Sequence, residues 1–381
     1  MLQRLARTGI ACALHWTGAN KLIGVLNGSR NMPLVLNYHR VVEDYAASAG
    51  QYMPEMLVSR RTLERHLDWL GRRYRFLSLD ELGARLESGE PFDKPVAAIT
   101  FDDGYRDVYD HAFPLLKRKG IPSAVFVVTD LIGTSRLQIY DKLYLLLHRA
   151  FSLWRSVPCD LARLLHGLGI RLPMLGMDEV KQVRHLAKDP FTAMRVLFTA
   201  LPHAELYRVI EALAGEVEID ESELKELHVC SWDMLAELHR AGVTIGSHTQ
   251  THALLTNEHW HKVLDETAGS RQVLERMLGL TIKHFAYPNG SFDAAAVRAV
   301  AVSGYGLAYT TCLHRNLAYP LLTIPRTFLW ENSCMDALGH FSPSIMSCKA
   351  HRVFDAFAPC NQHHDWTSES PRSPAAAVTV P

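Results

Sequence analysis

The sequence predicts an α/β fold in which mostly parallel strands form a closed or nearly closed barrel. Short apolar segments that fit buried strands recur along the 381-residue chain, and helical patterns lie between most of them. This alternation is typical of parallel α/β sheets. A barrel fits better than an open nucleotide-binding sheet, because no glycine-rich phosphate-binding motif follows any of the segments. The candidate strands are Leu34–His39, Val96–Phe101, Ser123–Val128, Val243–Ser247, His284–Tyr287, Leu307–Thr310 and Leu322–Pro325.

Capping residues mark the helices between these strands. Ser59 can cap a helix with a leucine stripe, and Ser78 with Glu81 makes a capping box at the start of the next helix. A helix that begins near residue 232 ends before Gly242, and one that begins near residue 263 stops at Gly279.

Three regions extend or interrupt the predicted barrel, which spans residues 33–330. Residues 1–32 form an N-terminal helical segment. Residues 141–227 carry helix-period patterns without a clear strand, which predicts a helical insertion between two barrel strands. Residues 331–381 form a C-terminal extension that we expect to be largely disordered, because it loses periodicity and ends rich in Ser, Pro and Ala.

The first residues bear on targeting. Residues 1–26 begin with positive charge, but His15, Trp16, Asn20 and Lys21 interrupt the apolar stretch before it could serve as a secretory signal. No run of eighteen apolar residues occurs, so no transmembrane helix is predicted. A packing helix and an amphipathic helix in contact with a membrane surface both fit this segment. We therefore expect a location in the cytoplasm or at the inner face of the membrane.

Bulk composition excludes some function classes. Forty basic and forty acidic residues leave no net charge, so the balance carries no signature of nucleic-acid binding. The seven cysteines are scattered and form no C-x-x-C pair. This pattern favours neither a disulfide framework nor a cysteine zinc site, and it fits a reducing compartment. The oligomeric state cannot be predicted.

The first chemical feature is a pair of adjacent carboxylates, Asp102 and Asp103, followed by Gly104 where an apolar strand ends. Ligands of parallel α/β barrels bind at the carboxyl ends of the strands. A turn there can bring both carboxylates to one site, where one holds a cation and the other takes a proton. A solvated Asp-Asp-Gly turn explains the same residues.

The second feature is a pair of histidines four residues apart, His248 and His252, which also follow an apolar strand. On one face of a helical turn this spacing lets both imidazoles reach one metal ion. In a chain with twenty histidines, a pair on the surface is the alternative. Together, one aspartate and two histidines supply three ligands and leave a position open for water, which is the pattern of a catalytic zinc site. A neighbouring carboxylate can take the proton of that water.

These motifs resemble those of a known family. Residues 100–104, Thr-Phe-Asp-Asp-Gly, resemble the first motif of the polysaccharide deacetylase (NodB homology) family, and residues 248–252, His-Thr-Gln-Thr-His, resemble its second. Residues 36–41 are similar to the opening of members related to exopolysaccharide deacetylases, and residues 285–290 are similar to the third motif. The family fold is a distorted (β/α) barrel, and its enzymes hydrolyse N- or O-acetyl groups on chitin-like glycans and peptidoglycan.

The resemblance implies roles for individual residues. Asp102 would be the catalytic base, and Asp103, His248 and His252 would be the metal ligands. Two imidazoles and one carboxylate suit zinc, although cobalt, manganese, nickel or iron also fit. The third motif and the last barrel strand would contribute contacts to the substrate or the oxyanion. The residues that would make these contacts are Tyr287, Pro288, Asn289 and Arg326.

The chain departs from the family at two positions. Ala286 stands where many members have an arginine that braces the catalytic aspartate, and Arg326 or Arg106 could substitute for it. Many members also end with a Leu-x-His whose histidine is the general acid, whereas this chain has Leu-Thr-Ile there. His314, taken as the catalytic partner of the base, and His39 are the candidates for that proton donor.

The function predicted from these residues is a metal-dependent hydrolase that removes N-acetyl groups from N-acetylated sugars. The partner would be a polysaccharide, an oligosaccharide, or a lipid- or nucleotide-linked saccharide. One alternative keeps the barrel and the metal but acts on another N-acyl group or a cyclic amide. The other is a glycan-binding member whose catalysis is weakened, which Ala286 and the missing Leu-x-His would favour.

Overall fold

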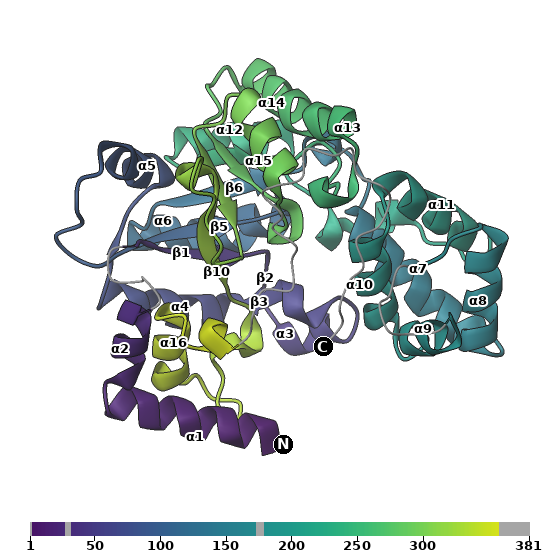
Figure 1. Cartoon of the computed structure of the whole chain (residues 1–381), viewed down its shortest axis with the longest axis horizontal. Coiled ribbons are helices and arrows are strands. Elements are labelled where there is room, and N and C mark those ends of the chain that lie inside the picture. The colour runs from purple at the N-terminus through teal and green to yellow at the C-terminus, as the bar shows by residue number, and fades with distance from the viewer. Residues whose placement is uncertain (1, 27–31, 173–178, 358–381) are drawn as a thin grey trace.

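In the computed structural model, which describes residues 2–26, 32–172 and 179–357, seven parallel strands close into a barrel (Figure 1). The strand order is β1-β10-β9-β8-β7-β6-β5, and β1 pairs with β5 to close the ring. This confirms the predicted distorted (β/α) barrel. The barrel strands are β1 (Leu34–Tyr38), β5 (Val96–Phe101), β6 (Ser123–Val127), β7 (Thr244–Ser247), β8 (His284–Ala286), β9 (Leu307–Thr310) and β10 (Ile324–Phe328).

Every predicted strand is present, and the last one shows the largest shift. Its start moves to Ile324 because the short helix η10 (Pro320–Leu322) precedes it. Three short strands were not predicted, because two or three residues carry too little pattern to indicate pairing. They are β4 (Arg75–Phe76), which extends the sheet beside β5, and the separate pair β2 (Arg40–Val42) and β3 (Leu57–Ser59).

Helices that cover the outside of the barrel begin and end where the predicted caps place them. Ser59 accepts a hydrogen bond from the amide of Thr62 at 3.1 Å, and Ser78 with Glu81 forms the capping box. Gly279 ends its helix in the left-handed conformation, with a φ of 67°. The helices are α3 (Tyr45–Ala49), α4 (Arg60–Gly71), α5 (Leu79–Ser88), α6 (Phe113–Lys119), α12 (Trp232–Arg240), α13 (Trp260–Leu264), α14 (Ser270–Leu278) and α15 (Ala294–Val302).

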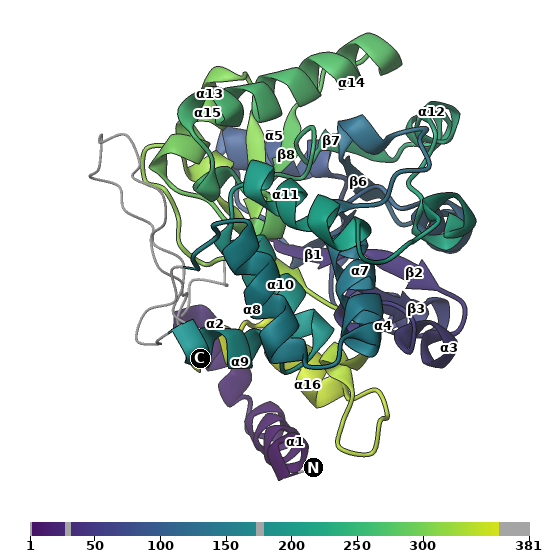
Figure 2. The ribbon, with the colours of Figure 1, turned by 90° about the vertical axis from the view of Figure 1, so that its right-hand side faces the viewer.

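A bundle of five helices follows β6 and has an apolar core of its own, to which Leu143, Leu197 and Leu206 contribute. Figure 2 shows α7 and α10 of this bundle in front of the barrel. It corresponds to the predicted insertion but begins two residues earlier, at Ile139; residues 173–178 lie outside the described residues. The helices are α7 (Ile139–Leu153), α8 (Val157–Gly167), α9 (Glu179–Leu186), α10 (Pro190–Ala200) and α11 (His203–Ala214).

The first two helices pack against the last α-helix of the described residues. Helices α1 (Leu2–Trp16) and α2 (Ala19–Leu26) lie beside α16 (Pro343–Ala350), where Ala11 is buried with Ile345 and Cys348. Within the described part of the chain, no helix is both long and apolar enough to cross a membrane.

The C-terminal prediction was wrong for residues 331–357, which are ordered. They form η11 (Glu331–Cys334), α16 and η12 (Phe354–Phe357). Six of the eight residues of α16 are buried, so the helix has no polar face and therefore no amphipathic period for sequence reading to detect. The prediction for residues 358–381 lies outside the described residues.

Candidate active site

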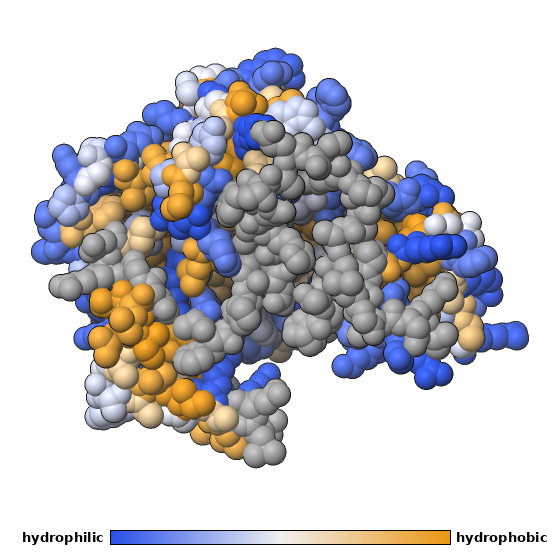
Figure 3. Space-filling view, in the orientation of Figure 1, coloured by the Kyte–Doolittle hydropathy of each residue, from blue (hydrophilic) through white to orange (hydrophobic). Residues whose placement is uncertain are grey.

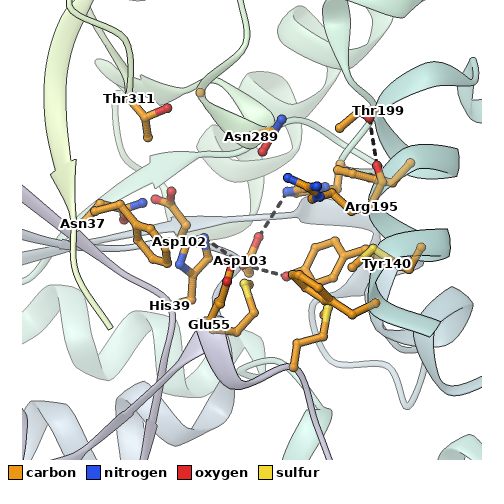
Figure 4. A pocket seen from close by; sticks show the side chains of 18 residues that line it. Asn37, His39, Glu55, Asp102, Asp103, Tyr140, Arg195, Thr199, Asn289 and Thr311 are labelled. Carbon is orange, nitrogen blue, oxygen red and sulfur yellow. Dashed lines mark hydrogen bonds and ion pairs between the residues drawn. The ribbon is translucent and has the colours of Figure 1, made fainter. Parts of the chain in front are cut away.

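A cavity of about 270 Å³ opens at the carboxyl ends of the barrel strands, between the barrel and the insertion (Figure 4). Asp102 and Asp103 follow β5, Asn289 follows β8 and Thr311 follows β9. Arg195 approaches from α10 on the opposite side. Apolar side chains line much of the remaining wall. They are Met53, Met56, Phe191, Met194, Phe198 and Phe328.

The three predicted metal ligands meet beside this cavity. Their ligand atoms lie within 4.8 Å of one another, and all three side chains are buried. Oδ1 of Asp103 is 3.6 Å from Nε2 of His248 and 3.3 Å from Nε2 of His252. Ligand atoms around a tetrahedral zinc ion are about 3.3 Å apart, from bond lengths of about 2 Å. Oδ1 of Asp103 is buried without a hydrogen-bond partner, so a cation fits this donor set.

The surroundings hold His248 and Asp103 in the protonation states that a cation needs. Burial lowers the pKa of His248 to about 4, so its imidazole is neutral near neutral pH. Burial alone would raise the pKa of Asp103, but the rings of His252, His39 and His248 hold it well below its usual range. Nδ1 of His248 donates to the carbonyl of Ala286 at 2.8 Å, which leaves Nε2 directed at Asp103.

The histidine motif is a loop, not the helical turn that the sequence predicted. Thr249 and His252 have positive φ angles of 71° and 63°, which end any helical path. The carboxylate of Glu266, from the π-helical turn η8 (Asp265–Gly269), accepts hydrogen bonds from the amides of Gln250 and Thr251 at 2.8 and 2.9 Å. Asp103 and Asn289 also have positive φ, so four of the five such non-glycine residues described lie at this site. Such backbone strain gathers at functional sites.

Asp102 lies beside the triad in a different environment. Both of its carboxylate oxygens accept hydrogen bonds from Arg326, each at 2.7 Å. Burial favours a higher pKa for Asp102, but the Arg326 guanidinium and His248 hold this pKa below its ordinary value. Asp102 is therefore an ionised carboxylate that Arg326 fixes next to the candidate cation position.

The insertion also contacts the triad. The Tyr140 hydroxyl, on α7, donates to Oδ2 of Asp103 at 2.7 Å, and it lies 2.7 Å from the Tyr105 hydroxyl. Tyr105 is hydrogen-bonded in turn to Oδ2 of Asp141 at 2.5 Å, and burial raises the pKa of Asp141 to about 7. The His252 ring packs between Tyr140 and Phe198. Neither Tyr140 nor Glu266 carries a motif in the sequence, so neither was predicted.

The other predicted residues divide into two groups. His39 and Asn289 line the cavity, and Nε2 of His39 is 3.8 Å from Oδ2 of Asp103. His314 does not line it, and its Nδ1 lies 3.0 Å from Sγ of Cys312. The Tyr287 side chain points into the core, where its hydroxyl donates to the carbonyl of Leu322 at 3.0 Å.

The chain is similar in sequence to a known protein family. The sequence profile of the family described as polysaccharide deacetylase matches residues 89–164 and 204–308, on both sides of the insertion. The chain belongs to the polysaccharide deacetylase family. The match contains both Asp102-Asp103 and the histidine loop, and the gap falls within the helices that the sequence predicted as an insertion.

Named relatives of this polysaccharide deacetylase family member are similar over part of the chain. Poly-beta-1,6-N-acetyl-D-glucosamine N-deacetylase from Staphylococcus epidermidis is 33% identical over 125 residues, covering 31% of this chain and 43% of the relative. The protein of the same name from Staphylococcus aureus (strain MSSA476) is 31% identical over 124 residues, covering 30% and 42%. The match thus spans less than half the length of these relatives. The structure of IcaB from Ammonifex degensii shares the fold, with a TM-score of 0.50 at 18% identity over 84% of this chain and 97% of that one.

One departure from the family pattern is accounted for by the barrel itself. Ala286 lacks the arginine that the resemblance leads us to expect, but a guanidinium reaches Asp102 from Arg326 on β10. Arg106, the other candidate, pairs with Asp110 at 3.1 Å on the surface.

Proposed function

We propose that this chain is a metal-dependent deacetylase that removes N-acetyl groups from an N-acetylated saccharide and releases acetate and a free amine. The observation that carries the proposal is the convergence of Asp103, His248 and His252. They meet at the edge of a cavity that Asp102, held by Arg326, also lines. The names of the curated relatives, which are N-deacetylases of a poly-N-acetylglucosamine, support the same reaction.

Asp103, His248 and His252 would hold the cation, and zinc is the metal that two imidazoles and one carboxylate favour. A bound divalent cation would supply Lewis acidity, which lowers the pKa of a water and polarises the acetyl carbonyl. Cobalt, manganese, nickel or iron would fit the same donors.

Asp102 takes the proton of the attacking water in this proposal. Its carboxylate is fixed on both oxygens by Arg326 and stays ionised, so it is ready to accept a proton at neutral pH. The water oxygen then forms a bond to the acetyl carbon, and the bond from that carbon to the sugar nitrogen breaks. Backbone amides near Asn289 would donate to the oxyanion that develops, since this strained turn lines the cavity.

The leaving amine needs a proton as the carbon–nitrogen bond breaks. His39 lies in the cavity, with its ring edge-on to Phe328, and is the better placed of the two candidate histidines. His314 contacts Cys312 and is not among the residues that line the cavity. We therefore assign the proton donor to His39.

The insertion shapes the part of the cavity that would receive the saccharide. Phe191, Met194 and Phe198 of α10 offer apolar surface to the acetyl methyl group and to a sugar face. Arg195 adds a positive charge on the same side. A polysaccharide, an oligosaccharide and a lipid- or nucleotide-linked saccharide all suit this lining, and the location in the cytoplasm or at the inner membrane face stays a prediction.

The experiment measures acetate from β-1,6-linked and β-1,4-linked N-acetylglucosamine oligomers and from a lipid-linked N-acetylated sugar. Metal-stripped protein, zinc-reconstituted protein and a zinc-treated His252→Ala variant are compared, with exposed His340→Ala as the matched control. We expect acetate only from zinc-reconstituted protein and the control. Stoichiometric zinc without acetate from any substrate would reject the deacetylase and favour another amide substrate or a glycan-binding role.

A further inference from the structure

Helices α1 and α2 expose an unusual amount of apolar surface. The described residues include fourteen exposed large hydrophobic side chains, and six of them lie within these two helices. The other eight are scattered between Leu153 and Leu338. Figure 3 shows the resulting apolar area at the lower left, where Figure 1 places α1 and α2. We call this the N-terminal apolar surface; it consists of Leu5, Ile10, Trp16, Leu22, Val25 and Leu26.

The opposite face of the same helices is fixed to the body of the protein. Ala11 is buried with Ile345 and Cys348 of α16, and the Asn20 side-chain amide donates to the Ser347 hydroxyl at 2.7 Å. Arg7 donates to the carbonyl of Ser333. The helices are therefore anchored, and they cannot turn their apolar side chains inward without breaking these contacts. Trp16 is 87% exposed and Leu26 is 78% exposed as a consequence.

The charged side chains of these two helices all have one sign. The first acidic residue of the chain is Glu43, whereas the two helices contain Arg4, Arg7 and Lys21. Arg4 and Lys21 are both exposed. The remaining 339 residues contain all forty acidic residues, so a segment of 42 residues without one departs clearly from the rest of the chain.

An anionic lipid bilayer matches both properties. Its headgroups attract Arg and Lys, its acyl boundary accepts Leu and Ile, and Trp favours the interface between them. A second copy of the chain fits less well, because a symmetric contact through this surface would bring the cations of both copies together. The helices have fifteen and eight residues, so they suit a position in the plane of the interface.

We propose that the N-terminal apolar surface binds this protein peripherally to anionic membranes. Leu5, Ile10, Trp16, Leu22, Val25 and Leu26 enter the acyl boundary, while Arg4 and Lys21 contact lipid phosphates. The inference does not depend on the proposed deacetylase reaction, since no residue of the surface lines the cavity.

The test is sedimentation of the full chain with vesicles of phosphatidylcholine, with and without phosphatidylglycerol. We expect stronger binding to the anionic vesicles, weakened by salt. The Trp16→Ser, Leu22→Ser, Leu26→Ser variant should lose at least about tenfold in partitioning, because the buried apolar area is lost. Arg4→Gln and Lys21→Gln should each lose about fivefold, from about 1 kcal/mol for each charge near the surface.

The matched control carries the same number of substitutions at exposed apolar positions elsewhere, Val302→Ser, Leu317→Ser and Leu338→Ser, and should bind as the unaltered chain does. Circular dichroism establishes that each variant is folded. Equal binding by the two triple variants would overturn the proposal. So would a dimer that the N-terminal variant abolishes without vesicle binding by the unaltered chain, or binding that appears only after residues 358–381 are removed.

Discussion

Arg326 donates to both carboxylate oxygens of Asp102, at 2.7 Å each, although 224 residues separate the two in sequence. The contact depends on barrel closure, because β10 must pair with β1, where Arg326 lies opposite Val35. Both side chains are almost fully buried. A buried carboxylate without a partner lowers the free energy of unfolding. This pair therefore couples the stability of the barrel to the charge and position of the proposed base.

Replacement of Arg326 by Met should therefore affect both activity and stability. We expect kcat to fall by about a hundredfold or more, as for the loss of general-base catalysis, with a smaller change in KM. The free energy of unfolding should fall by about 3–5 kcal/mol, because Asp102 loses its buried partner. Arg326→Lys should recover part of both, and Arg106→Met on the surface should change neither. Full activity in a folded Arg326→Met variant would show that Asp102 does not need Arg326 to act as the proposed base.

The hydroxyl of Tyr140 should matter for metal affinity, since it fixes the Asp103 carboxylate from outside the ligand set. Loss of such a partner typically weakens metal binding by about 10–100-fold. We expect Tyr140→Phe to show this loss in a competition titration with a zinc chelator. Tyr144→Phe, on the same helix, is the control and should bind zinc as the unaltered chain does. Equal affinities for the two variants would show that the insertion does not support the ligand.

The chain of Asp103, Tyr140, Tyr105 and Asp141 contains three close oxygen–oxygen contacts, of 2.7, 2.7 and 2.5 Å. If Asp141 is ionised, the hydroxyls of Tyr140 and Tyr105 donate to the carboxylates of Asp103 and Asp141. No proton then remains to form a hydrogen bond between the two tyrosine oxygens. If Asp141 is protonated, all three contacts are hydrogen bonds. The raised pKa of Asp141, about 7 because of burial, agrees with the protonated form.

This predicts a stability that declines with pH. The folded-state pKa of Asp141, about 7, exceeds its ordinary value of 3.8, so the native state binds the additional proton. The contribution of this proton to the free energy of unfolding is fully present below pH 3.8. It is lost as the pH rises through about 7. Asp141→Asn keeps a donor toward Tyr105 and should remove this slope, whereas the exposed Asp93→Asn should keep it. Urea unfolding between pH 4 and pH 8 measures both, and parallel curves for the two variants would contradict the assignment.

The sequence predicts those features that depend on local pattern. Buried strands, caps and the two metal-binding motifs are local, and the predicted barrel strands place Asp102, Asp103 and His248 correctly at the strand ends. The choice between Arg326 and Arg106 could not be made, because it depends on which strands meet when the barrel closes. The sequence could not decide between His39 and His314 as the proton donor, because the answer depends on where the loop after β9 lies relative to the cavity.

Other features of the site and the fold have no local pattern in the sequence. Tyr140 reaches Asp103 only through the packing of α7 on the barrel, and periodicity reports the buried face of a helix but not its neighbour. The loop from His248 to His252 follows the left-handed conformations of Thr249 and His252, which are held by Glu266. Helix α16 lacks an exposed polar face, so its sequence shows no alternation of polar and apolar residues at the helical period. The other helices were predicted from that alternation.

The most direct test of the central claim separates metal binding from turnover at adjacent residues. Asp102→Asn keeps the shape of the side chain and leaves Asp103, His248 and His252 in place. We predict one zinc ion for each chain in both the variant and the unaltered protein, with acetate release from N-acetylglucosamine oligomers reduced by about a hundredfold or more in the variant. An Asp102→Asn protein that binds zinc and releases acetate at an unchanged rate would contradict the proposed site.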